Sequence, residues 1–145
     1  PLVADADPRV AGLEADAAAF GAVGAAYGLP KQTDEEKHLR REAIAGALRQ
    51  ALEPPRRVLR AAAAAVRHLP RLAEIGNPNL ISDTGVAAIM CAAAAQAAEL
   101  NVRINLAALQ DEALTAAVER ETAAQLEEIH KLSAQTQEIV RARIG

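Results

Sequence analysis

Short polar side chains gather at two places in an otherwise apolar stretch of this 145-residue chain. The first group is Asn77, Asn79 and Asp83, and the second is Asn101, Arg103 and Asn105. Asparagine and aspartate offer donors and acceptors to the edge of a heterocycle, and an aspartate can also transfer a proton. Turn formation and helix capping are the simpler use of the first group. The residue types alone therefore leave a binding or catalytic site and a structural role both open.

The spacing of the two groups limits how they can work together. A helix is expected over about 83–104, with Ser82 or Asp83 as its cap, and its residues are apolar on nearly all sides. Asp83 and Asn101 then share one face of this helix at a separation of roughly 27 Å. One compact site in a single chain cannot use both, whereas a long ligand or two antiparallel chains can. Asn101 and Asn105 are one turn apart and can act together.

Asp16 is a further candidate for chemistry. A helix is expected over residues 8–27, because Asp7 can cap it and a proline follows at its first position. Asp16 lies on the same apolar stripe as Leu13 and Phe20. A carboxylate that faces a core is costly unless it is paired, so Asp16 is either hydrogen-bonded structurally or placed for chemistry.

The next helices are marked by caps and prolines. Thr33 and Glu36 form a capping box that starts a helix at Asp34, which Pro54-Pro55 ends or kinks. A further helix is expected from Pro55 to Gly76, where glycine suits a left-handed residue after a helix end. Four arginines lie within a face of that helix roughly 60° wide, namely Arg56, Arg60, Arg67 and Arg71. This stripe is either a solvated outer face or a surface for an anionic ligand tail.

The last helix is expected to begin after Asp111, which can cap it. Its apolar stripe consists of Leu114, Val118, Leu126, Ile129, Leu132 and Ile139. Acidic and basic residues occupy the remaining positions, so this helix should cover the outside of a bundle or face a partner. His130 has no second ligand-like residue at a metal spacing, and His38 and His68 lie in charged surroundings, so we expect no metal site.

The composition indicates an all-α protein. Hydrophobic residues make up 51% of the chain with one Phe, one Tyr and no Trp, so the core must consist of Ala, Leu, Val and Ile. Alanine is the strongest helix former, and it lets helices approach closely. Because alanine buries little area, we expect a bundle of antiparallel helices around the central alanine-rich helix, with a homodimer interface. Residues 1–145 are treated as a single domain.

Charge and cysteine content exclude several classes of partner. A net charge of −3 argues against a general nucleic-acid binder. The uncharged run 84–98 is shorter than the roughly 20 residues that span a bilayer, so no membrane segment is expected. The single Cys91 suits a reducing cytoplasm and is interpreted as a small buried hydrophobe. The chain begins with Pro1 and shows no signal peptide, and we interpret it as the remainder of a longer protein.

Longer sequence blocks resemble a known family. The string GNPNLISDTGVAA, followed by LNVRINL, is similar to the cyclodeaminase/cyclohydrolase family. This helical domain occurs in formiminotransferase-cyclodeaminases and as stand-alone methenyltetrahydrofolate cyclohydrolases. The block DAAAF from Asp16, then Leu29-Pro30-Lys31 and the charged run 33–37, resembles the family's earlier block. The resemblance covers essentially the whole chain.

The resemblance implies long antiparallel helices, a dimer, and one-carbon chemistry on tetrahydrofolate. The expected reaction is hydrolysis of 5,10-methenyltetrahydrofolate to 10-formyltetrahydrofolate, with tetrahydrofolate as substrate and no other cofactor. The alternatives are a formiminotetrahydrofolate cyclodeaminase, which releases ammonia, and an inactive helical dimerisation module. Both reactions pass through a tetrahedral carbon between two nitrogens, so both need a proton relay.

The resemblance also assigns roles to residues. Asp83 and Asp16 are the candidates for proton transfer, with Asp83 preferred because its loop can be open to substrate. The candidates for holding the pterin and its anionic tail are Lys31, Asn77, Asn79, Asn101, Arg103 and Asn105. Family members usually begin with a helical segment that carries a Pro-Gly-Gly-Gly-Ser motif, and this chain has no match to it. Without that segment, part of the core and of the folate site would be missing.

Overall fold

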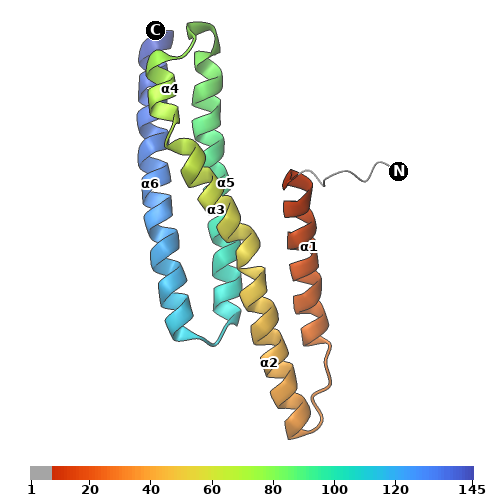
Figure 1. Cartoon of the computed structure of the whole chain (residues 1–145). Coiled ribbons are helices and arrows are strands. Elements are labelled where there is room, and N and C mark those ends of the chain that lie inside the picture. Colours follow the sequence, from red (N-terminus) through yellow and green to blue (C-terminus); the bar gives the residue numbers. More distant parts are fainter. Residues whose placement is uncertain (1–7) are drawn as a thin grey trace, which may run out of the picture. The chain divides into compact units, whose positions relative to one another are not determined.

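The computed structural model describes residues 8–145, with side chains from Glu14 onward. It contains the helices α1 (Pro8–Tyr27), α2 (Asp34–Ala51), α3 (Glu53–Val66), α4 (Leu69–Ile75), α5 (Ile81–Ala108) and α6 (Glu112–Ile144), and the short 3-10 helix η1 (Pro78–Leu80) (Figure 1). The part of the chain that is described has no β-strand, which confirms the all-α prediction. Asp7 and the side chain of Leu13 lie outside it.

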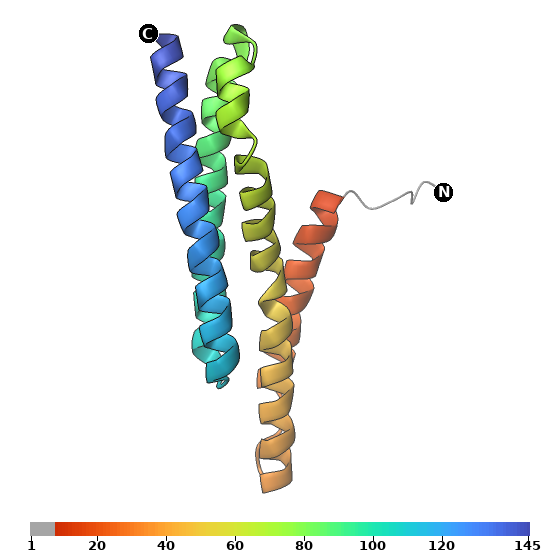
Figure 2. The same ribbon diagram turned by 60° about the vertical axis from the view of Figure 1, so that its left-hand side comes forward.

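The chain divides into two compact units. The first holds α1, α2, the start of α3 up to Pro54 and residues 103–110, and the second holds α3 from Pro55, α4, α5 up to Val102, and α6. In the first unit α1 and α2 form an antiparallel hairpin, visible in both views (Figures 1 and 2). Arg40 holds the turn, because its Nη2 donates to the carbonyl oxygen of Tyr27 at 3.1 Å. The same guanidinium lies over the Tyr27 ring, 5.6 Å from its centroid.

The predicted capping box starts α2 as expected. Glu36 N–H donates to Thr33 Oγ1 at 3.1 Å, and Thr33 N–H donates to Glu36 Oε2 at 3.0 Å. The two bonds satisfy backbone donors that the first turn of a helix leaves without partners. The capped turn fixes the connector that carries Lys31 at the entrance to α2.

In the second unit α5 and α6 lie side by side and antiparallel (Figures 1 and 2). Ser133 joins them, because its buried hydroxyl donates to the carbonyl oxygen of Ala88 at 2.8 Å. The start of α6 confirms another prediction, since Leu114 N–H donates to Asp111 Oδ1 at 3.1 Å. Along α6 the predicted stripe is buried or half-buried throughout, with Val118 and Ile129 most deeply so.

The single helix predicted from Pro55 to Gly76 is wrong. The chain instead forms α3 and α4, with a break after Val66. Pro70 lies in the first turn of α4, where its missing N–H needs no partner. In the interior of a continuous helix the same proline would have removed a hydrogen bond.

Gly76 does end α4, but the predicted left-handed conformation is wrong. Its φ is −68° and its ψ is 167°, which is extended backbone open to any residue. Glycine is required here by space, because a Cβ at this position would lie 2.5 Å from the carbonyl oxygen of Leu72. The predicted cap of the next helix is also wrong. Since α5 begins at Ile81, Ser82 and Asp83 lie inside its first turn.

The core is aliphatic, as the composition predicted. Its most deeply buried large side chains are Leu52, Leu59, Val66, Val102, Val118 and Ile129. The expectation that other helices surround α5 is wrong for this chain, because one face of α5 is exposed from Val86 to Ile104. The buried side chains of α5 are mostly alanines, joined near its ends by Ile81, Val102 and Leu106, whereas its other large apolar side chains are exposed.

Candidate functional site

Asp83 lies exposed in the first turn of α5. Its carboxylate has no hydrogen bond or ion pair with any other residue that the structure describes. A carboxylate in the first turn of a helix interacts favourably with the helix dipole. Asp83 is therefore free to accept a proton or a ligand donor from solvent.

The loop before Asp83 is organised by its own amide groups. Asn77 Oδ1 accepts a hydrogen bond from Asn79 N–H at 3.0 Å, and Leu80 N–H donates to the carbonyl oxygen of Asn77 at 2.9 Å. Asn77 thus has the structural role that the turn interpretation expected. The side-chain amide of Asn79 remains exposed. The loop presents Asn79 and Asp83 to solvent while Asn77 shapes it.

The second polar group, Asn101, Arg103 and Asn105, likewise contains both exposed residues and one with a structural contact. Asn101 is exposed, and its Nδ2 donates one turn back to the carbonyl oxygen of Ala97 at 3.3 Å. Asn105 is half-buried, and its Nδ2 donates to the carbonyl oxygen of Ala51 at 3.1 Å, which ties α5 to the end of α2 within the first unit. Arg103 is exposed and takes part in an interaction within the chain. Asn105 therefore makes a structural contact, whereas Asn101 is exposed and its side-chain amide oxygen can accept a hydrogen bond.

Asp16 and Lys31 belong to the first unit, and both are exposed. The prediction that Asp16 faces a core is wrong within this chain, because its neighbour on the stripe, Phe20, is 81% exposed. Only Ala26 of α1 is fully buried among the described side chains of that helix. The packing of α1 on α2 therefore uses small residues near the C-terminal end of α1. The face of α1 that carries Asp16 stays exposed.

An apolar stripe lies between Asp83 and Asn101 on α5. Its large members are Val86, Ile89, Met90, Leu100 and Ile104, and each is more than half exposed. Ala93 and Ala97 are exposed on the same face. A continuous apolar face of this length on one helix is typical of a surface that another protein segment covers. By length and composition 78–108 is also apolar enough to cross a membrane.

The arginine stripe binds carboxylates of the protein. Arg56 Nη2 donates to Glu121 Oε2 at 2.6 Å, and Arg67 forms a two-pronged pair with Glu128, with both bonds at 2.7 Å. Arg71 Nη1 donates to Glu74 Oε2 at 3.0 Å, and Arg60 also has an interaction within the chain. Arg56 and Arg67 therefore bind glutamates of α6, while Arg60, Arg67 and Arg71 remain exposed, as the interpretation of a solvated outer face expected.

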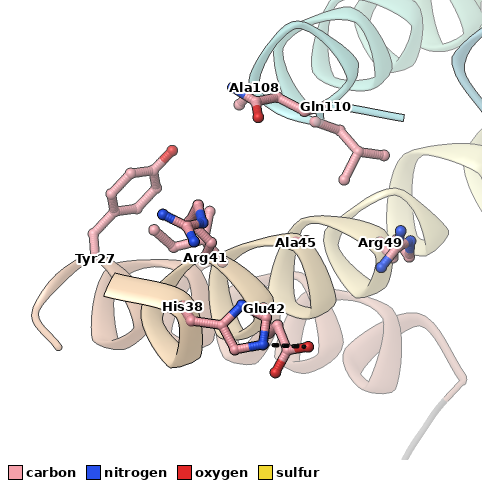
Figure 3. Close-up of a pocket in the computed structure, with 10 residues that line it drawn as sticks. Tyr27, His38, Arg41, Glu42, Ala45, Arg49, Ala108 and Gln110 are labelled. Atoms are coloured by element: carbon pink, nitrogen blue, oxygen red, sulfur yellow. Dashed lines mark ion pairs between the residues drawn. The ribbon is translucent and has the colours of Figure 1, made fainter. Parts of the chain in front are cut away.

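A cavity of about 630 Å³ lies in the first unit, and none of the eight predicted site residues lines it (Figure 3). Its charged lining residues are Arg41, Glu42 and Arg49, and the neighbouring His38 has its Nε2 3.4 Å from Glu42 Oε1. The two arginines outnumber the single carboxylate. Sequence reasoning missed this hollow, although its lining residues recur on one face of α2 at helical spacing. Such a lining suits an anionic group.

Cys91 is half-buried on α5. Burial raises the pKa of its thiol, so the thiol stays protonated near neutral pH. This supports the structural interpretation of the residue.

The comparison with known protein families agrees with the sequence blocks. The family model described as formiminotransferase-cyclodeaminase matches residues 7–124, which include all eight predicted site residues. The chain belongs to this family. The sequence-based resemblance is thereby confirmed, and the formiminotransferase-cyclodeaminase match ends inside α6, 20 residues before the end of that helix at Ile144.

Individual relatives of this family share most of the chain. It is 38% identical to the methenyltetrahydrofolate cyclohydrolase of Methylorubrum extorquens over 130 residues, which are 90% of this chain and 62% of the relative. It is 35% identical to the formimidoyltransferase-cyclodeaminase of Sus scrofa over 131 residues, 90% of this chain and 24% of that protein. The chain thus spans less than two thirds of the curated relatives that it matches.

A solved family structure shares the fold. The crystal structure of formiminotetrahydrofolate cyclodeaminase from Thermotoga maritima superposes with a TM-score of 0.79 at 29% identity. The superposition covers 94% of this chain and 64% of that one. The helical arrangement described above is therefore that of the formiminotransferase-cyclodeaminase family.

Proposed function

We propose that this chain is a tetrahydrofolate one-carbon enzyme that hydrolyses 5,10-methenyltetrahydrofolate to 10-formyltetrahydrofolate. The observation that carries the proposal is the 38% identity to a methenyltetrahydrofolate cyclohydrolase over 90% of the chain. The site residues proposed below all fall inside the stretch that the family model matches.

The reaction requires a proton acceptor and a proton donor but little else. Water oxygen bonds to the methenyl carbon while its proton leaves to a base, which gives a tetrahedral carbon between N5 and N10. The hydroxyl on that carbon then loses its proton as the bond from the carbon to N5 breaks, N5 takes a proton, and the resulting formyl group stays on N10. A carboxylate that cycles between its charged and neutral forms can serve both steps.

Asp83 is the proposed proton-transfer residue. Its carboxylate is exposed and has no partner among the described residues, so it can meet both water and substrate. Asp16 is the second candidate, on the exposed face of α1. The proposed substrate-holding residues are Lys31, Asn77, Asn79, Asn101, Arg103 and Asn105. Among these, Asn77 and Asn105 act mainly by shaping the site, because each uses a side-chain atom in a backbone hydrogen bond.

The working unit in this proposal is a homodimer in which two α5 helices pair antiparallel. The exposed face of α5 supports this dimer, because the sequence of apolar residues along the face is palindromic about Ala95. Val86 is then opposite Ile104 of a second copy, Met90 opposite Leu100, and Ala93 opposite Ala97. A two-fold interface needs this self-complementarity, and alanines at its centre allow helix axes to approach to about 8 Å.

The same pairing brings the two polar groups together. Within one chain Asp83 and Asn101 are separated by roughly 27 Å along the helix axis. In the antiparallel pair Asn101 of the second copy is opposite Ile89, which lies six residues from Asp83. The separation along the axis falls to roughly 9 Å, a span that one folate ring system can bridge.

A turnover assay with matched variants tests this function. The full chain and its Asp83→Asn variant are compared on 5,10-methenyltetrahydrofolate, with Glu112→Gln as control. Glu112 is also an exposed acid in the first turn of a helix, so the control reproduces the loss of a helix-end charge. Asp83→Asn should lower kcat by about 10²- to 10⁴-fold, and Glu112→Gln should leave it unchanged. Equal activity of all three proteins would remove Asp83 from catalysis.

A second candidate function is the cyclodeaminase reaction. It is favoured by the named activities of the pig relative and of the Thermotoga maritima structure. Release of ammonia from 5-formiminotetrahydrofolate, measured on the same variants, decides between the two. A chain that serves only as a helical dimerisation module would bind neither folate in calorimetry.

A further inference from the structure

The last turn of α6 reaches the loop that precedes Asp83. Arg143 Nη1 donates to the carbonyl oxygens of Ala73 and of Glu74, the second at 3.0 Å. Its Nη2 donates to the carbonyl oxygen of Gly76 at 3.4 Å. These carbonyls end α4, where the last turn of a helix leaves its acceptors without intrahelical partners. One guanidinium therefore caps α4 from a helix 67 to 70 residues further along the chain.

An apolar contact supports the same connection. Ala73, Ile81 and Val140 form a small buried cluster, with Ile139 packed against it. Gly85, one turn into α5, lies so close to α6 that a Cβ there would be 3.1 Å from Val140 Cγ1. Ala73 precedes the loop and Ile81 follows it, so both ends of the loop are fixed to the end of α6.

The loop itself has little else to hold it. All four residues 77–80 are exposed, so no side chain of the loop is buried against a core. Its internal bonds are local: Gly76 N–H donates to the carbonyl oxygen of Leu72 at 2.8 Å, and the Asn77 bonds close the next turn. Local bonds fix the shape of the loop but not its direction. The contacts from α6 supply that direction.

We propose that Arg143 is a positioning residue for the candidate site: it caps α4 and thereby orients the loop that presents Asn79 and Asp83. The proposal rests on the proposed function of that loop. Arginine suits the task because its planar fork donates several hydrogen bonds at once, whereas lysine offers a single ammonium centre. A cation also interacts favourably with the C-terminal end of a helix. Arg143 lies outside residues 7–124, which the family model matches.

Two variants and a matched control test the proposal in the full chain. Arg143→Ala removes every hydrogen bond that the Arg143 side chain makes to α4 and Gly76. Arg143→Lys keeps the positive charge but loses the planar guanidinium group. Arg141→Ala is the control, because Arg141 lies on the same exposed turn and its side chain donates to Gln137 Oε1 instead, at 3.3 Å. Amide hydrogen exchange at Gly76 and Leu80 reports on the loop. Turnover of 5,10-methenyltetrahydrofolate gives kcat and KM separately.

Arg143→Ala should raise exchange at both loop amides by about tenfold or more, with exchange around Ile129 unchanged. It should lower kcat by about 10- to 100-fold with a smaller change in KM, because small displacements of a catalytic group slow the chemical step. For Arg143→Lys, both the exchange rates and kcat should lie between those of the wild type and Arg143→Ala. For Arg141→Ala, both should equal the wild-type values. If Arg143→Ala does not fold, the comparison of Arg143→Lys with the wild type tests the positioning role by itself.

Two outcomes overturn the proposal and differ from each other. If the wild type is active and the Arg143 variants keep its kcat, the loop does not depend on Arg143 and the positioning role is wrong. If the wild type acts on neither folate, the proposed function fails first, and the positioning role fails with it.

Discussion

Asp83 and Asn101 lie on one face of a single unbroken helix, roughly 27 Å apart along its axis. Both are exposed, and the large side chains between them on that face are apolar and exposed as well. No small substrate can touch both residues of one chain. If both serve one compact site, a second copy must provide one of them.

A charge placed in the apolar stripe should break the dimer. Met90 is 62% exposed in the single chain and lies opposite Leu100 in the proposed pair. Met90→Glu would bury a carboxylate without a partner, so analytical ultracentrifugation should show a monomer. Ala134→Glu, at an exposed position of α6, is the control and should stay dimeric. A wild type that is monomeric in buffer, or that stays dispersed only in detergent, would contradict the pairing.

Gly76 and Gly46 should respond to alanine in opposite directions. At Gly76 a Cβ would lie 2.5 Å from a backbone oxygen, so Gly76→Ala must shift the end of α4 and should lower Tm. At Gly46, inside α2, nothing lies within 4 Å of an added Cβ. Gly46→Ala should therefore stabilise the protein by about 0.5–1 kcal/mol through helix propensity. Thermal unfolding followed by circular dichroism measures both, and a stabilised Gly76→Ala would refute the close approach.

The ion pair between Arg67 and Glu128 should make the stability of the protein depend on pH in the acidic range. The hydrogen bond from Arg67 lowers the pKa of the Glu128 carboxyl below its ordinary value of 4.5. A lowered folded-state pKa gives stability that is full above the ordinary value and is lost as pH falls through the folded-state value. From pH 7 to pH 3 the wild type should lose slightly more stability than Glu128→Gln. The pair is exposed, so the effect should shrink in high salt.

Glu127→Gln is the matched control for that titration, because Glu127 is an exposed neighbour on the same helix. Its Tm should follow the wild type at every pH. An identical acid dependence in Glu128→Gln and the wild type would show that the pair adds nothing to stability.

Local signals in the sequence predicted much of the fold. The Thr33 capping box and the Asp111 cap begin α2 and α6 where expected, because these bonds form within one turn of chain. The break between α3 and α4, just before Pro70, was missed, since the alanine-rich run before it fits a continuous helix. The stripe on α5 was wrongly expected to be covered, because apolar periodicity does not say whether the covering surface belongs to the same chain.

The candidate site was harder to predict than the fold. Asn77 forms the turn that its residue type suggested, and its partner is two residues away. Asn105 binds Ala51, a contact across 54 residues that no local pattern could indicate. Arg143 lies still further from the loop that it caps. Contacts of this range depend on the packing of helices, and only the structure reveals them.

A mixed dimer tests the central claim, that Asp83 of one chain and Asn101 of another serve the same site. Differently tagged Asp83→Asn and Asn101→Ala chains are produced together, and the dimer that carries both tags is purified. Its turnover of 5,10-methenyltetrahydrofolate is compared with that of each single-variant dimer. If the site is shared, one site of the mixed dimer carries both substitutions and the other carries neither. The mixed dimer should then recover about half of the wild-type activity. A mixed dimer no more active than the two single-variant dimers would contradict the shared site.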